Sequence, residues 1–176
     1  MTQLSQFSSE EERSSEISNI PSYEVSSWGR VRNKNTQFYI AATKKPNGLR
    51  MVGLMDSGGQ RKRSLPLLVA NAFVPRPQAS FDTPMHLNGD RANNDYRNLV
   101  WRPLWLARKF MKQFEDDYHE TCDYPIEDVE TGEWYKNSME ASMTNGVLDE
   151  HIRLAMLNNT YVFPTGQVFR KAILDR

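Results

Sequence analysis

The chain has 176 residues with 39% apolar side chains, enough to bury a hydrophobic core in one domain or two small ones. No run of about 18 apolar residues occurs, which excludes a membrane-spanning helix. The N-terminal stretch lacks the apolar segment and basic start of a signal peptide, and the single cysteine, Cys122, excludes an intramolecular disulfide. These features predict a soluble cytoplasmic protein without a membrane partner.

The net charge of zero is an average over three unlike segments. Residues 1–20 carry one arginine against four glutamates, and residues 21–112 carry 16 lysines and arginines against five acidic residues, a net charge of +11. Residues 113–176 carry five basic and 13 acidic residues, a net charge of −8. Because neutralised phosphates release counterions, a basic block of this density predicts contact with a polyanion; a solvated charged face is the alternative.

The first predicted elements are short strands. Residues 1–18 are rich in Ser, Glu and Gln, which predicts a disordered or loosely packed tail. From Ile20 onward, apolar and polar residues alternate as they do in half-buried strands. The pattern predicts a hairpin with its turn at Trp28-Gly29 and two further strands bounded by turn residues; the four strands are residues 23–26, 30–32, 38–40 and 49–55.

Two helices flank the central part of the chain. Residues 60–64 are basic and predicted to be exposed, and residues 65–73 form a short apolar helix that ends before Pro75. Pro103 opens a longer helix that we expect to run to about Glu120, because its apolar residues keep helical spacing.

The acidic C-terminal part of the chain, from residue 121 onward, is predicted to form a separate small module. A strand-turn unit over residues 124–135 precedes two short helices, the first capped by Asn137 with Glu140 as its capping-box partner. The second helix covers residues 148–157, and a hairpin closes the chain. Two helices about a Gly-containing turn are compatible with a helix-turn-helix, although any αα-hairpin gives the same pattern.

The most informative segment is residues 84–101, PMHLNGDRANNDYRNLVW. Its His, Gly, Asn-Asn and Asn-Leu-Val-Trp order resembles the ββα active-site loop of phage-type HNH homing endonucleases. Residues 20–33, IPSYEVSSWGRVRN, are similar to the modular DNA-binding element at the start of many of these enzymes. The resemblance runs from residue 19 to about residue 155.

This resemblance implies an α+β fold. A small antiparallel sheet would be followed by an HNH-like ββα unit over residues 84–112 and by a C-terminal strand/helix-turn-helix-like module. The expected division is a tail over residues 1–18, a basic HNH-endonuclease-like domain over residues 19–120 and an acidic module over residues 121–176.

The chemistry of the family needs a histidine general base and a divalent cation, typically Mg²⁺. The resemblance places the base at His86 and the two cation ligands at Met85 and Ala107. A thioether is too soft for a hard cation and a methyl group has no donor, so we expect no metal or other cofactor and a vestigial His86. The alternative is an active endonuclease that holds Mg²⁺ through Asp90, Asp95 or Asn98.

The expected ligand is therefore nucleic acid, DNA or RNA, held without cleavage. Trp28 and Tyr39 are candidates for base stacking or groove contact, with a place in the core as the alternative for each. The alternative to a nucleic-acid ligand is a protein partner on the acidic C-terminal half. If the chain is phage-encoded, the resemblance places it in the host cytoplasm. Four motif residues are expected to be structural: Asn93, Asn94, Asn98 and Trp101. The expected nucleic-acid contacts are Trp28, Arg30, Arg32, Lys34, Lys44, Lys45, Arg50, Arg61, Lys62, Arg63, Arg91 and Arg97.

Overall fold

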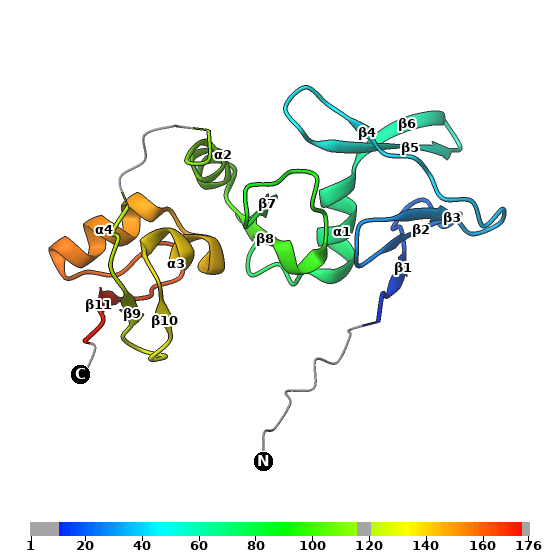
Figure 1. The fold of residues 1–176 in the computed structure, drawn as a ribbon. Coiled ribbons are helices and arrows are strands. Elements are labelled where there is room, and N and C mark those ends of the chain that lie inside the picture. Colours follow the sequence, from blue (N-terminus) through cyan, green and yellow to red (C-terminus); the bar gives the residue numbers. More distant parts are fainter. Residues whose placement is uncertain (1–10, 116–120, 174–176) are drawn as a thin grey trace, which may run out of the picture.

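The computed structural model describes residues 11–115 and 121–173 (Figure 1). These residues form an α+β fold of short antiparallel sheets and four α-helices, which confirms the predicted fold class. No helix in the described ranges has both the length and the apolar character that a membrane crossing requires.

The first sheet has the order β1-β2-β3 and contains β1 (Ser14–Glu16), β2 (Tyr23–Ser26) and β3 (Val31–Asn33). The predicted β2–β3 hairpin is confirmed. The prediction of a loose tail is wrong at its end, because β1 pairs with β2 and Ile17 is buried. Ile17 gives this polar segment an anchor in the core that its composition conceals. Residues 1–10 lie outside the described residues.

The second sheet contains β4 (Thr43–Lys44), β5 (Arg50–Asp56) and β6 (Gly59–Ser64). The basic segment expected only to be exposed is a strand that pairs with β5 along its whole length. The strand expected at residues 38–40 is reduced to a single bridge between Arg32 and Tyr39. Phe38 and Tyr39 are both exposed there, and only Ile40 of this segment packs against the core.

The central part of the chain is a ββα unit, as predicted. It consists of β7 (Thr83–His86), β8 (Leu99–Arg102) and α2 (Leu104–Lys112), with a short 3₁₀ turn, η1 (Tyr96–Asn98), before β8. The predicted helix α1 (Leu65–Phe73) packs beside it, and its Val69 and Ala70 share a core with Trp101. The helix expected to reach Glu120 ends at Lys112, and residues 116–120 lie outside the described residues.

The C-terminal module has its own core. It contains β9 (Ile126–Asp128), β10 (Trp134–Tyr135), α3 (Ser138–Asn145), α4 (Asp149–Asn158) and β11 (Phe169–Lys171). Asn137 caps α3 as predicted, accepting a hydrogen bond from the Glu140 N–H at 2.8 Å. The closing hairpin is limited to one bridge between Val162 and Gln167, because β11 pairs with β9 instead.

The α3–α4 turn is packed onto the ββα unit. The buried Arg102 guanidinium donates from Nε to the Gly146 carbonyl at 2.8 Å and from Nη2 to the Asn145 carbonyl at 2.7 Å. Gln113 donates to Ser142 Oγ at 3.1 Å, and Leu148 joins a buried cluster with α2. The positive charge of Arg102 at the C-terminal end of α3 also interacts favourably with the helix dipole. Figure 1 shows α2 between β7–β8 and this module.

Candidate nucleic-acid interface and motif loop

The loop between β7 and β8 is held by its asparagine and aspartate side chains. Asn98 Nδ2 donates to the Asn93 carbonyl at 2.9 Å, and Asn98 Oδ1 accepts from the Asn88 N–H at 3.1 Å. Asn93 Oδ1 accepts in turn from the Asp95 N–H at 3.3 Å. Such side-chain to backbone bonds stabilise tight turns, so Asn98 makes the cross-loop contacts expected of a structural residue.

The β2–β3 hairpin packs directly against this loop. The Tyr96 N–H donates to the Ser27 carbonyl at 2.8 Å, across the two segments. Gly29 has φ +80°, and a Cβ at this position would lie 2.7 Å from Asn94 Cβ. Only glycine fits such a turn at such a close approach, so the basic hairpin and the motif loop form one surface.

His86 and Asn94 form a buried pair at the base of the loop. The two side chains are 3% and 4% exposed, and His86 Nε2 lies 3.2 Å from Asn94 Oδ1, within reach for the Nε2–H to donate. Asn94 Nδ2 donates to the Ala92 carbonyl at 3.0 Å, which fixes the amide. Burial lowers the pKa of His86 below its ordinary value of 6.5, while the Asn94 hydrogen bond opposes this shift. Burial and the Asn94 contact therefore favour the neutral form of the imidazole.

The two positions that the resemblance assigns to cation ligands lie in an apolar cluster. Met85 is 1% exposed and Ala107 is 5% exposed, and both belong to one buried group with Leu106, Phe110 and Leu148. This cluster offers a thioether and methyl groups where Mg²⁺ requires oxygen ligands. The side chains at these positions therefore do not fit a hard cation.

The substitute ligands considered above all have structural partners. Asp90 Oδ1 accepts from the Ala92 N–H at 2.8 Å. Asp95 accepts two hydrogen bonds from the Arg97 guanidinium, which holds the pKa of that carboxyl below its usual range. Within the ranges 11–115 and 121–173, no three His, Cys, Asp or Glu side chains gather in a way that could hold a metal ion.

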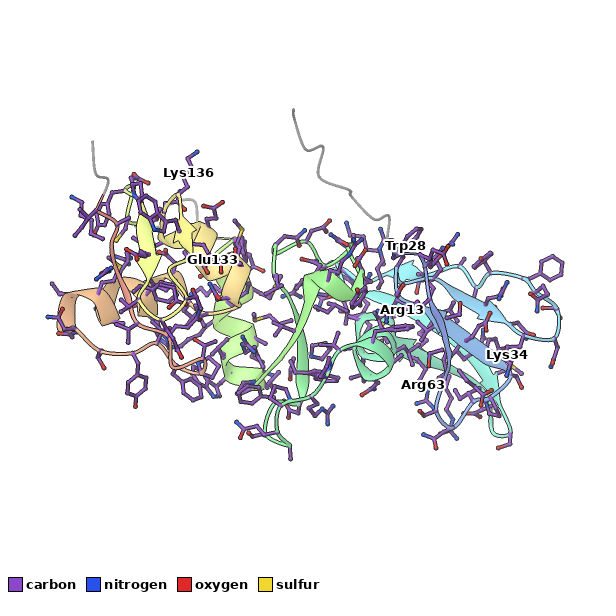
Figure 2. The ribbon with its side chains drawn as sticks, turned by 90° about the horizontal axis from the view of Figure 1, so that it is seen from below. Arg13, Trp28, Lys34, Arg63, Glu133 and Lys136 are labelled. Carbon is purple, nitrogen blue, oxygen red and sulfur yellow. The ribbon has the colours of Figure 1, made fainter. Side chains whose placement is uncertain are left out.

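About half of the predicted phosphate contacts are already paired with carboxylates. Ion pairs join Arg30 to Glu12, Arg32 to Glu24, Lys34 to Glu16 and Arg97 to Asp95, and Asp56 lies 3.5 Å from Arg61 and 3.6 Å from Arg63. Glu12 and Glu16 come from outside the basic block, so the end of the molecule that carries this block is less positive than its net charge of +11 indicates. Figure 2 shows Lys34 and Arg63 at that end, away from Glu133 and Lys136.

Four cations of the β4–β5–β6 sheet make no ion pair in the described part of the chain: Lys44, Lys45, Arg50 and Lys62. Lys62 lies opposite Gly53 in the strand register, and alternation places it on the face away from the buried Val52 and Leu54. Arg91 donates to the Asn47 carbonyl at 3.1 Å and so joins the motif loop to the β4–β5 turn. We call Lys44, Lys45, Arg50 and Lys62 the sheet cations.

The three aromatic residues singled out in the sequence have different environments. Trp28 is 46% exposed at the tip of the β2–β3 hairpin, which leaves it available to a ligand. Tyr39 is also exposed and lies under the Arg30 guanidinium, 5.0 Å from the ring centroid. Trp101 is buried, and its Nε1–H donates to the Val74 carbonyl at 2.9 Å, as a core residue would.

Sequence reasoning missed two features of this region. Arg102 follows three residues of a buried strand, and no local pattern shows that it binds the end of α3. Trp105 and Phe163 stack across the two modules with ring centroids 5.9 Å apart and an interplanar angle of 19°. The two residues are far apart in the sequence, so no local pattern indicates that their rings meet.

Three comparisons relate the chain to known proteins. No family model matches the chain. A protein of Acanthamoeba polyphaga mimivirus, described as an uncharacterized HNH endonuclease, is 25% identical over 95 residues, or 54% of this chain; the match spans 28% of that protein. A solved structure described as "DNA binding and cleavage by the HNH homing endonuclease I-HmuI" has a TM-score of 0.49 and 18% identity, covering 93% of this chain and 99% of the other.

Proposed function

We propose that this chain is a nucleic-acid-binding protein on an HNH homing endonuclease-like scaffold, and that it holds its ligand without hydrolysing it. The observation that carries the proposal is the set of sheet cations without carboxylate partners. Such cations can neutralise phosphates without first giving up an ion pair. Arg91 of the motif loop lies beside this sheet, because it donates to the Asn47 carbonyl in the β4–β5 turn, and Trp28 is exposed on the β2–β3 hairpin.

DNA is the ligand that the resemblance favours. HNH endonucleases act on the phosphodiester backbone, and the similarity to a viral HNH endonuclease supports placing this chain near that family. An antiparallel sheet with exposed lysines also suits the backbone of RNA, so RNA is the competing ligand.

The absence of cleavage is proposed from the residues around His86. Hydrolysis by a histidine base needs a cation to stabilise charge on the phosphate, and the apolar Met85–Ala107 cluster does not fit one. Asp90 and Asp95 would have to leave their backbone and arginine partners to serve instead. His86 itself is buried against Asn94 rather than open to a water molecule and a phosphate.

Salt-dependent binding tests the proposal. Fluorescence anisotropy would measure Kd for labelled duplex DNA, single-stranded DNA and RNA at salt concentrations between about 50 and about 200 mM. Replacing Lys44 and Lys62 with Gln should make the negative slope of log affinity against log salt shallower by about 0.9 for each lost contact to duplex DNA. Lys136→Gln, an exposed lysine at the far end of the molecule, is the matched control.

Two results would count against this proposal. An affinity that does not change with salt would contradict electrostatic contact with phosphates. Equal effects of Lys136→Gln and of the Lys44/Lys62 double variant would contradict binding at the sheet cations. Binding to RNA alone would keep the function but replace the ligand.

A further inference from the structure

We propose that Trp105 and Phe163 form a stacking site for an unpaired nucleotide. This inference rests on the proposed nucleic-acid binding and adds a second contact, at the junction between the ββα unit and the C-terminal module. Trp105 lies in the first turn of α2, and Phe163 lies in the segment between α4 and β11.

The pair is unusually open for a contact between modules. Trp105 is 48% exposed and Phe163 is 46% exposed, although their rings stack on each other. Other contacts at this junction are buried, including Arg102, Gln113 and Leu148. Because those contacts already join the modules, an exposed aromatic stack is not needed for packing and presents ring surface to a ligand.

The stack borders an open groove of about 560 Å³. Its lining combines apolar surface from Leu104 and Phe81 with polar groups that can meet the edge of a base: Gln78, Ser80, Asp82 and Arg108. A volume of this size lies within the range of small-ligand sites. The Asp82 carboxylate already accepts a hydrogen bond from Thr83 at 2.9 Å and can accept from an exocyclic amine as well.

The charge beside the groove suits the phosphate of a nucleotide. Arg108 is exposed and makes no ion pair in the described ranges 11–115 and 121–173. Helix α2 carries Arg108, Lys109 and Lys112 but no acidic residue. An aromatic face for the base and a guanidinium for its phosphate are the two elements of single-strand recognition.

The occupant must be unpaired, because bases inside a duplex are covered on both faces by their neighbours. Stacking on an aromatic side chain tolerates any base, since each has a π-face. The site therefore predicts a preference for structure, such as a bubble, an overhang or a flipped base, and not for sequence.

Binding to matched ligands tests this inference. Anisotropy would compare one duplex with the same duplex carrying an internal mismatch bubble, for the wild type and for Trp105→Ala. We expect tighter binding to the bubble, and a loss of about 5- to 150-fold in that binding for Trp105→Ala with duplex affinity unchanged. Trp105→Phe should retain most of the preference, and Trp134→Ala, an equally exposed tryptophan in β10, should retain all of it.

A spectroscopic readout separates stacking from a structural role. A base stacked on Trp105 should quench its emission, so the quenching caused by the bubble ligand should be lost in Trp105→Phe while binding persists. Equal weakening of duplex and bubble by Trp105→Ala, or no weakening of either, would overturn the stacking site. A concentration-dependent dimer that Trp105→Ala abolishes would assign the patch to self-association instead. If the wild type binds no nucleic acid, the proposed function fails together with this site, whereas duplex binding without a bubble preference removes only the site.

Discussion

The apolar cluster around Met85 gives the sharpest prediction about stability. Met85 is 1% exposed among Leu106, Ala107 and Phe110. Met85→Ala should lower the free energy of unfolding by about 2–5 kcal/mol, because the removed atoms no longer contribute their burial and a cavity remains in the cluster. Met85→Leu keeps the volume and should cost less than about 1.5 kcal/mol.

Met85→Asp should cost more than Met85→Ala, because it also buries a polar group without a partner, at about 1–3 kcal/mol. Burial would raise the pKa of the introduced carboxyl above its ordinary value of about 3.9. Its contribution to stability is then intact below that value and lost as pH rises through the higher folded-state pKa. The variant should thus be less destabilised at about pH 4 than at about pH 7.

Urea unfolding followed by circular dichroism measures these differences. With a slope of about 2 kcal/mol/M, Met85→Ala should lower the midpoint by about 1–2.5 M. Met55→Asp, at a position that is 56% exposed on β5, is the control and should change stability by less than about 0.5 kcal/mol. A Met85→Asp protein as stable as Met85→Leu would refute a closed apolar cluster, and so would a wild-type midpoint that rises on addition of Mg²⁺.

Other predictions concern the motif loop and the module junction. Asn98→Ala removes a donor and an acceptor from the loop and should cost about 1–3 kcal/mol, seen as a lower Tm; an unchanged Tm would contradict the cross-loop role. Arg102→Ala leaves two carbonyls at the end of α3 unpaired and should speed hydrogen exchange across α3 and α4, whereas unchanged protection would contradict the docking. His86 should titrate below 6.5 by NMR, so its contribution to stability is present above 6.5 and lost as pH falls toward its folded-state pKa; titration above 6.5 would contradict its burial.

The elements predicted from the sequence were those with a clear period and clear boundaries. Alternation with a Trp28-Gly29 turn located the first hairpin, and Pro75 and Pro103 marked the end of α1 and the start of α2. Strand β6 was missed because its residues are basic and polar, so its pairing with β5 comes from the backbone and leaves no apolar pattern. The same reason hides β1 in a segment rich in Ser and Glu.

The motif order indicates candidate site residues but not the contacts that they make. The motif order located His86 and Asn98, and the chemistry of Met85 and Ala107 followed from their side chains. Their enclosure with Leu148 depends on how a distant module packs, which no local pattern encodes. The carboxylate partners of Arg30, Arg32 and Lys34 were likewise hidden, because each lies at least eight residues away in the sequence.

A cleavage assay on a complex whose formation has been demonstrated decides whether the chain holds nucleic acid or cuts it. Labelled duplex DNA would be bound at low salt, Mg²⁺ or Mn²⁺ added, and the strands resolved on a denaturing gel, with His86→Ala beside the wild type. A chain that holds nucleic acid without cutting it leaves full-length strands in every lane in which binding is detected. Strand breaks that need the divalent cation and disappear in His86→Ala would show that the chain cuts nucleic acid, and would contradict the proposed binding without cleavage.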